Sequence, residues 1–336
     1  MLVAFDQSKH RYVHADQAQR HAKYVCSACQ APVQLKCGMT RTAHFAHQKS
    51  QACQGEGEAE SVTHLMGKYT LWQYFKQRQI NVVLEPWLAT IQQRPDLLIS
   101  YQGRRIAIEY QCAAISIEQV QRRTAGYRRL GMQVIWLLGP TYQQRRLQAG
   151  TLAKFCCLRH GNLQVGFWQQ NDVNWQIWTD KKSQGQPAQF MKQQLLKLQQ
   201  QVLQRDGRIK ALQEQLYRQQ YHVIGIPLCC HIPIALPAGP KEPVWVITTK
   251  LILWLTKYRC TYKELQHFIL QQPWYVMGVI SATVSKQLWL RCVLRYWLQE
   301  NMIVLKGPYI LLTDRVRWFT DFQTKWAAID TIYHER

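Results

Sequence analysis

The residues of this chain best suited to chemistry gather in the stretch 94–111, where acidic and amide side chains interrupt two apolar runs. The runs flank a Gln-Gly pair at 102–103, which is typical of a tight β-hairpin. With that pair as the loop, Asp96 faces Glu109; with the loop one residue later, Asp96 faces Gln111. Either register places the three side chains on one face of the hairpin, because Glu109 and Gln111 are two residues apart.

Carboxylates that face each other across antiparallel strands lie about 5 Å apart and repel. A divalent cation removes this conflict, and Mg²⁺ or Mn²⁺ suits carboxylates that share a site with water and a phosphate. The cation can then activate water and stabilise charge at phosphorus. We therefore expect Asp96 and Glu109 to hold the metal and Gln111 to position water. The alternative is a surface hairpin with solvated acids.

The elements around the hairpin must bring further polar groups to it. Glu60, His64 and Lys68 are spaced by four, so they share one face of a helix predicted over 58–78. Glu60 is a further candidate metal ligand, and His64 and Lys68 would lie near the scissile phosphate. Strand 81–91, the hairpin, helix 116–131 and strand 133–138 follow. The order αβββαβ predicts an α/β core with a mixed sheet.

A second set of metal-ligand residues precedes this core. Cys26 and Cys29 form a C-x2-C pair, and His44 and His47 form an H-x2-H pair before Cys53. Such pairs are typical of a tetrahedral Zn²⁺ site, which would stabilise a small domain without being catalytic. His44, His47 and Cys53 compete for the last two positions, and His47 and Cys53 are favoured. The alternative is that the thiols are incidental.

The charge of the chain points to a polyanionic partner. Its 42 Lys and Arg stand against 20 Asp and Glu, a net charge of +22, and nucleic acid is the commonest partner of such proteins. A purely solubilising role is the alternative. Four arginines in the predicted helix 116–131 are candidates to grip the DNA backbone, or else form an ordinary solvated face. They are Arg122, Arg123, Arg128 and Arg129.

The sequence gives little reason to expect that the protein associates with a membrane or is located in an oxidising compartment. It begins without a signal peptide, and the apolar run 251–255 is too short to span a bilayer. Its 11 cysteines include two adjacent pairs and do not resemble a disulfide framework. We therefore expect a cytoplasmic protein with no membrane partner.

Composition and periodicity divide the chain into six parts. Residues 1–56 are rich in Cys and His, 57–145 hold the α/β core, and 146–186 form an aromatic-rich β extension with a hairpin turning near Asn171-Asp172. Residues 187–225 predict a long Gln-rich helix interrupted near Gly207, and 226–243 a Pro-rich linker. Residues 244–336 are predicted to be a mainly α-helical C-terminal domain.

The residues Pro95-Asp96 and Glu109-Tyr-Gln111 resemble the PD-(D/E)xK nuclease superfamily, and the chain more narrowly resembles the CoiA family of competence proteins. The resemblance covers residues 1–140 well and the rest only by overall arrangement, and it depends on several segments in a fixed order. These are Cys26-Ser-Ala-Cys29, Ala43-His-Phe-Ala-His47, Glu60-Ser-Val-Thr-His64, Gly67-Lys68, Gln93-Arg-Pro-Asp96, Ile108-Glu-Tyr-Gln-Cys112, Arg123, Tyr127, Gly131 and Val134-Ile-Trp-Leu137.

This resemblance implies a restriction-endonuclease-like core with a zinc-finger-like N-terminal region. It implies a role in recombining imported single-stranded DNA during natural transformation, beside the recombinase and its loader. The superfamily usually has Lys where this chain has Gln111, and Gln can bind a water but cannot carry charge. Lys68 is a candidate to supply that charge.

Three functions are compatible with these features. The leading hypothesis is a metal-dependent deoxyribonuclease acting on single-stranded DNA or recombination intermediates. The alternative is a catalytically inactive DNA-binding recombination accessory module that recruits partners. The third, an RNA-binding regulatory protein, is compatible with the charge alone.

Overall fold

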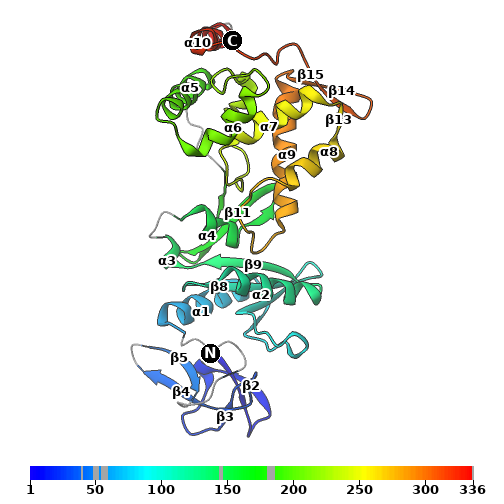
Figure 1. The fold of residues 1–336 in the computed structure, drawn as a ribbon. Helices are drawn as coiled ribbons and strands as arrows, with labels where there is room; N and C mark the ends of the chain where they lie inside the picture. Colours follow the sequence, from blue (N-terminus) through cyan, green and yellow to red (C-terminus); the bar gives the residue numbers. More distant parts are fainter. Residues whose placement is uncertain (39–40, 48–52, 54–59, 144–146, 180–185, 335–336) are drawn as a thin grey trace. The chain divides into compact units, whose positions relative to one another are not determined.

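The computed structural model describes residues 1–38, 41–47, 53, 60–143, 147–179 and 186–334 (Figure 1). The chain separates into two compact units. Unit 1 comprises Met1–Trp178 with Val276–Ile280, and unit 2 comprises Thr179–Tyr275 with Ser281–Arg336. The predicted domain boundaries at 56/57 and 145/146 lie outside the described residues. No helix among the described residues is long and apolar enough to cross a membrane.

The N-terminal part of unit 1 is a five-stranded antiparallel sheet in the order β2-β1-β3-β4-β5. Its strands are β1 (Val3–Asp6), β2 (Arg11–His14), β3 (Tyr24–Val25), β4 (Pro32–Gly38) and β5 (Arg41–His47), with a 3-10 turn at Ala15–Gln17. A small apolar core that includes Val13, Tyr24, Val33 and Phe45 fills the space beneath it. The Cys- and His-rich region is therefore a folded sheet and not a bare metal-binding loop.

A larger mixed sheet follows in unit 1. The elements are α1 (Val62–Gln77), β6 (Asn81–Leu84), β7 (Leu97–Tyr101), β8 (Arg104–Gln111), α2 (Ile117–Arg129) and β9 (Gln133–Leu138). Strands β6, β7 and β8 pair antiparallel, and β8 pairs parallel with β9 after the crossover through α2. The sequence predicted a strand to residue 91, but β6 ends at Leu84. The next residue, Glu85, has a positive φ of 49°, which breaks the strand conformation.

The β7–β8 hairpin has the first of the two predicted registers. Tyr101 pairs with Arg104, and Leu97 pairs with Ile108. Gln102 and Gly103 form the two-residue loop and have positive φ angles of 49° and 71°. A loop with φ > 0 at both positions matches the twist of the two strands, which explains why Gly stands there. Asp96 comes directly before β7.

The aromatic-rich segment extends the same sheet. It contains α3 (Pro140–Gln143), α4 (Ala149–Phe155), β10 (Cys157–Arg159), β11 (Asn162–Gln169) and β12 (Asp172–Ile177). Strand β11 pairs parallel with β9, so the sheet reaches seven strands in the order β10-β11-β9-β8-β7-β6, with β12 on β11. The predicted hairpin is present, and its loop is Gln170-Asn171, one residue before the predicted turn.

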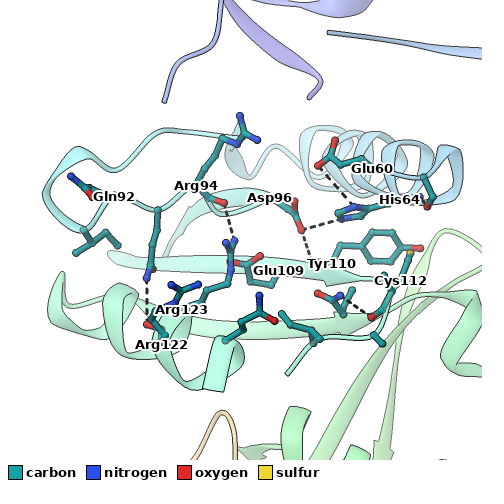
Figure 2. A pocket seen from close by; sticks show the side chains of 18 of the residues that line it. Glu60, His64, Gln92, Arg94, Asp96, Glu109, Tyr110, Cys112, Arg122 and Arg123 are labelled. Carbon is teal, nitrogen blue, oxygen red and sulfur yellow. Dashed lines mark hydrogen bonds and ion pairs between the residues drawn. The ribbon is translucent and has the colours of Figure 1, made fainter. Parts of the chain in front are cut away.

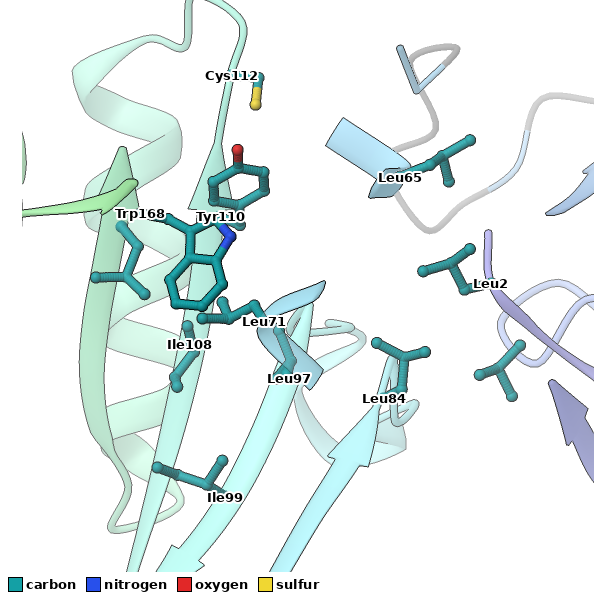
Figure 3. Packing of buried hydrophobic residues seen from close by; sticks show 12 residues of the cluster. Leu2, Leu65, Leu71, Leu84, Leu97, Ile99, Ile108, Tyr110, Cys112 and Trp168 are labelled. Atoms are coloured by element: carbon teal, nitrogen blue, oxygen red, sulfur yellow. The ribbon is translucent and has the colours of Figure 1, made fainter. Parts of the chain in front are cut away.

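The apolar core of the larger sheet also includes residues from the start of the N-terminal sheet (Figure 3). Leu2 and Val3, at the start of β1, belong to the same buried cluster as Leu65 of α1 and Leu84 of β6. Figure 3 shows Leu2 beside Leu65 and facing Leu84. The zinc-finger-like region predicted over 1–56 is thus packed into the α/β core.

Unit 2 begins with α5 (Pro187–Leu203) and α6 (Gly207–Tyr217), where the sequence predicted one long helix interrupted near Gly207. The break lies at Arg205, whose φ of 51° cannot continue a helix. The segment 226–243, which the sequence predicted to be a Pro-rich linker, contains the fully buried residues Ile226, Cys230 and Leu236. A 3-10 turn at Leu228–Cys230 lies within it. The apolar residues between its prolines make this segment part of the core.

The rest of unit 2 combines helices with a small sheet. Its elements are α7 (Val244–Lys257), β13 (Cys260–Thr261), α8 (Tyr262–Leu270), α9 (Ala282–Gln299), β14 (Ile303–Lys306), β15 (Tyr309–Leu312) and α10 (Phe322–His334). The sequence predicted a mainly helical region and missed the sheet, whose strands of two to four residues are too short to show alternation. Helix α10 packs on α5 around Leu195 and Ile329.

Candidate functional site

A pocket of about 720 Å³ opens in unit 1 where α1, α2 and the ends of β7 and β8 meet (Figure 2). Five of the six residues predicted to be catalytic line it: Glu60, His64, Asp96, Glu109 and Gln111. The sixth, Lys68, is fully buried behind the pocket wall. The structure therefore brings together side chains that are up to 51 positions apart in the sequence.

The approach of α1 to β8 depends on a glycine. A Cβ at Gly67 would lie 2.1 Å from Cε1 of Tyr110, so only a residue without a side chain lets the helix lie against this ring. Helix α1 begins at Val62 with Ser61 as its N-cap, whose hydroxyl accepts the backbone N–H of His64. Glu60 therefore precedes the helix. The sequence had predicted that Glu60 would lie on one helix face with His64 and Lys68.

Asp96 is held by three donors from two elements. The backbone N–H of Tyr110 donates to Oδ2 at 2.8 Å, and His64 Nε2 lies 3.4 Å from the same oxygen. Lys68 Nζ lies 3.6 Å from Oδ1. Burial alone would raise the pKa of Asp96, but His64 and Lys68 hold it well below its usual value. Asp96 is therefore an anion with its two oxygens fixed in direction.

Glu60, His64 and Asp96 each offer one ligand atom, and these atoms all lie within 4.8 Å of one another. Burial lowers the pKa of His64, but the carboxylate of Asp96 outweighs this effect and raises it. Two carboxylates and an imidazole so close together are a donor set that a divalent cation can use. Figure 2 shows the three side chains turned toward one another between α1 and β7.

Glu109 faces a different set of partners. Arg123 of α2 donates to Oε1 from Nε at 3.0 Å and from a terminal nitrogen at 2.5 Å, and the hydroxyl of Tyr127 donates to the same oxygen. Burial raises the pKa of Glu109 to about 6, although Arg123 opposes this rise. Glu109 is thus close to Asp96 in the pocket but lies outside the Glu60-His64-Asp96 group.

The four arginines that were predicted to bind DNA divide into three positions. Arg123 is directed at Glu109 and also donates to the backbone carbonyl of Arg94, because its side of α2 faces β8. Arg122 and Arg129 are exposed and line the pocket, seven residues apart on one side of the helix. Arg128 is exposed but does not line it. Two of the four are therefore placed to meet a ligand in the pocket.

Gln111 ends β8 at the pocket. Its amide Nε2 donates to the carbonyl of Ala113 at 2.8 Å, which fixes the direction of the side chain. The amide oxygen can accept a hydrogen bond from water, but the group carries no charge.

Lys68 stands at the centre of an ionic network that the sequence only partly indicated. Its Nζ lies 2.5 Å from Glu60 Oε1 and also binds Glu85, a fully buried acid just after β6. Burial would raise the pKa of Glu85, but Lys68 lowers it to about 2. Sequence analysis missed Glu85, because an isolated acid between Leu84 and Pro86 belongs to no pattern.

The same network ties the N-terminal strand to the site. The backbone N–H groups of Leu2 and Val3 donate to Glu85 Oε2 at 2.8 and 3.2 Å. The amino group of Met1 lies 3.0 Å from Glu60 Oε2. One carboxylate therefore binds Lys68 with one oxygen and β1 with the other.

Arg94 is a second residue that the sequence did not single out. Its guanidinium is buried at the pocket wall, and burial lowers its pKa while Glu85, Glu60 and the thiols of Cys26 and Cys53 raise it. One terminal nitrogen has no hydrogen-bond partner among the described residues. Its position directly before the Pro95-Asp96 pair was the only available signal.

Four of the five predicted zinc ligands lie together in the N-terminal sheet. The ligand atoms of Cys26, Cys29, His47 and Cys53 lie within 4.8 Å of one another, and the three thiols are free of disulfides. The Cys26 and Cys53 sulfurs are 3.9 Å apart, and Cys29 Sγ is 3.3 Å from His47 Nε2. A tetrahedral zinc site has edges of about 3.8 Å between sulfurs and about 3.5 Å between sulfur and nitrogen. The donor set fits such a metal.

His44 does not join this cluster. Its Nδ1 lies 2.9 Å from the carbonyl of Thr42, and alternation along β5 turns it away from the face that carries Phe45 and His47. Burial would raise the pKa of the Cys26 thiol, but the backbone N–H groups of Cys29 and Ala28 lower it. These hydrogen bonds favour the thiolate, the form that binds metal.

We predict that Lys68→Met destabilises the protein by about 3–5 kcal/mol, because it leaves three buried or partly buried carboxylates without their shared cation. Denaturant unfolding measures the change. Lys76→Met is the matched control, since Lys76 is exposed near the end of the same helix and should cost less than about 1 kcal/mol. Equal losses in the two variants would contradict the network.

We predict that the purified full-length protein carries one metal ion at the Cys26-Cys29-His47-Cys53 cluster. His47→Ala should weaken metal binding at least about tenfold, whereas His44→Ala should leave it unchanged. Elemental analysis after dialysis measures the content and identifies the metal. Loss of metal from the His44 variant alone would show that the cluster is assigned to the wrong face of β5, and loss from both variants or from neither would contradict His47 as the ligand.

Two family models match this chain, and the second match continues from unit 1 into unit 2. The chain matches the model of the competence protein CoiA N-terminal domain over residues 7–56 and that of the CoiA nuclease-like domain over 60–212. Competence protein CoiA of Bacillus subtilis (strain 168) is 34% identical over 124 residues, which are 37% of this chain and 33% of that relative. The match thus spans about a third of the relative's length. No solved structure matches. Because both domain models match in order, the chain belongs to the CoiA family of competence proteins.

Proposed function

We propose that this protein is a divalent-metal-dependent deoxyribonuclease that processes imported DNA during natural transformation. The observation that carries the proposal is the convergence of Glu60, His64, Asp96, Glu109 and Gln111 on one pocket. The order of helix, three strands, helix and strand around it supports a restriction-endonuclease-like core of the PD-(D/E)xK type. Free cysteines and the role implied by the family support action in the cytoplasm.

The residues have separable roles in this proposal. Asp96 and Glu109 hold Mg²⁺ or Mn²⁺, with Glu60 and His64 as further ligands from the side of α1. When bound, the metal activates water and stabilises charge on the phosphate. Gln111 positions the attacking water through its amide oxygen. Lys68 keeps Asp96 and Glu60 ionised, and Arg123 keeps Glu109 turned toward the pocket.

The N-terminal cluster holds a structural Zn²⁺ in this proposal. Three thiols and one imidazole are a frequent ligand set for structural zinc and leave no open position for catalysis. The metal stabilises the small sheet that carries β1 into the α/β core. The substrate is single-stranded DNA or a recombination intermediate, and the partners are the recombinase and its loader, as the family's competence role implies.

One observation favours the alternative, a DNA-binding accessory module that does not cleave. The four carboxylates of the ionic network around the pocket are matched by four cations, so this network is formally neutral before any metal binds, and Arg122 and Arg129 at the rim add positive charge. The acids are Glu60, Glu85, Asp96 and Glu109, and the cations are Lys68, Arg94, Arg123 and the amino group of Met1. A divalent cation binds best where negative charge is in excess. In this alternative the pocket and its arginine rim hold DNA without catalysis.

We predict that the wild-type protein cleaves labelled single-stranded or branched DNA with Mn²⁺ or Mg²⁺. Asp96→Ala and Glu109→Ala should each lower the rate by about a hundredfold or more, because each removes a charge that acts at the reacting phosphate. Glu214→Ala is the control, since Glu214 is an exposed acid of α6 in unit 2. Product formation on gels measures the rate.

The two functions give different results in this assay. Cleavage that both pocket variants lose, with folding and DNA binding intact, supports the nuclease. No cleavage of any substrate by the wild type, with tight and salt-sensitive binding, would reject the nuclease and leave the accessory module.

We predict that Arg122→Ala with Arg129→Ala weakens DNA binding and lowers the slope of log K against log salt by about two, because each arginine releases about one counterion. Arg128→Ala is the matched control on the same helix and should leave the slope nearly unchanged. Fluorescence anisotropy with inactive Asp96→Ala protein at several salt concentrations measures both quantities. If the slope fell with Arg128→Ala and not with the double substitution, the DNA would lie on another face of α2.

A further inference from the structure

Residues 244–312, which belong to unit 2 except for Val276–Ile280, have the element order of a winged helix. Helix α7, strand β13, helices α8 and α9, and the β14–β15 hairpin follow one another, and the sheet order is β13-β15-β14. Helix α7 packs on β15, α8 packs on α9, and α9 lies beside β14. In proteins with this arrangement the third helix can enter the DNA major groove, while the hairpin loop forms the wing. Because a fold alone does not define function, the surface must carry the argument.

Helix α9 leaves only a narrow face uncovered. Trp289, Leu290, Val293 and Trp297 are fully buried, which fixes the rotation of the helix against its neighbours. Lys286 is also buried, and it donates to the carbonyls of Leu270 and Gln272 at 2.6 and 2.8 Å. This lysine caps the end of α8 and so holds the two helices together.

The uncovered face of α9 carries a polar row with one residue per turn. Its members are spaced by four: Thr283, Gln287, Arg291 and Arg295. Arg291 and Arg295 are exposed and lie about 6 Å apart along the helix axis. Glutamine and arginine are side chains that read base edges in the major groove, and arginine also binds phosphate.

The β14–β15 hairpin supplies a further exposed cation, Lys306, beside its loop. Lys306, Gly307, Pro308 and Tyr309 are all exposed, and Gly307 has the positive φ of 58° that the tight loop needs. Residues 244–312 contain eight Lys and Arg against two Asp and Glu, a net charge of +6, and α9 itself contains no acid. One of the two acids, Glu264, is used in the capping box of α8. The surface is therefore complementary to a polyanion.

We propose that residues 244–312 form a second DNA-binding module, which binds double-stranded DNA with α9 in the major groove and the β14–β15 loop on the backbone. A helix about 10–12 Å in diameter fits the major groove of B-DNA, which is about 12 Å wide. The narrow major groove of A-form RNA excludes it. The polar row on α9 lacks the aromatic platforms on which single strands stack. The module needs neither a metal nor the pocket of unit 1, so it does not depend on the proposed nuclease.

The test uses the full-length protein and a fluorescent duplex of about 20 base pairs, which is two helical turns. Anisotropy titrations in EDTA at several salt concentrations compare the wild type with Arg291→Ala/Arg295→Ala. The double variant should bind the duplex at least about tenfold more weakly and lower the salt slope by about two. Lys306→Ala tests the wing independently and should lower the slope by about one.

Lys197→Ala/Lys210→Ala is the matched control, because it removes two exposed charges from α5 and α6 of the same unit. Thermal unfolding followed by circular dichroism shows whether each variant is folded. Because the substituted arginines are exposed, their replacement should not lower the thermal stability. Duplex affinity of the arginine variant equal to that of the lysine control would overturn the proposal. An equal loss of binding to single-stranded DNA or to duplex RNA would overturn it as well, because the surface would then be a general anion site.

Asp96→Ala separates this proposal from the nuclease. It should keep full duplex binding whether or not the wild type cleaves DNA. A wild type that cleaves, together with an arginine variant of unchanged duplex affinity, would retain the nuclease and reject the winged-helix module.

Discussion

Lys68 enters the interior of unit 1 as a cation with no exposed surface, and the candidate site is arranged around it. Its ammonium group meets Glu60, Glu85 and Asp96, which come from the start of α1, the end of β6 and the start of β7. A buried charge is stable only when it is paired, so these three chain segments must stay together. The burial of Lys68 raises the cost of separating them, and the acids in turn keep the lysine charged.

This network also joins two regions that look independent in the sequence. Glu85 binds Lys68 on one side and the backbone of Leu2 and Val3 on the other, and Leu2 packs with Leu65 and Leu84. The Cys-His cluster lies in the same N-terminal sheet. A metal there therefore stabilises a strand whose first residues are part of the α/β core, and its effect is not confined to a small separate domain.

The sequence was sufficient where a local pattern fixed the geometry. The Gln102-Gly103 pair indicated a hairpin with two possible registers, of which the structure has the first, and the C-x2-C pair with His47 and Cys53 indicated a cluster that strand alternation then separates from His44. It was insufficient where geometry depends on distant partners. Glu85 belongs to no motif, Arg123 is turned to Glu109 by the packing of α2, and the Pro-rich segment 226–243 has buried apolar residues between its prolines. The short strands β13–β15 carry too few residues to show a period.

Gly67 shows how the absence of a side chain can set the distance between reactive groups. Every missense change at this codon adds a Cβ, and that atom would overlap the ring of Tyr110. Tyr110 lines the pocket, and its backbone N–H is bound to Asp96. A genetic variant at a position with no side chain of its own would thus affect the carboxylate through one aromatic residue. Natural variation at this codon is therefore expected to be narrower than at the acids' exposed neighbours.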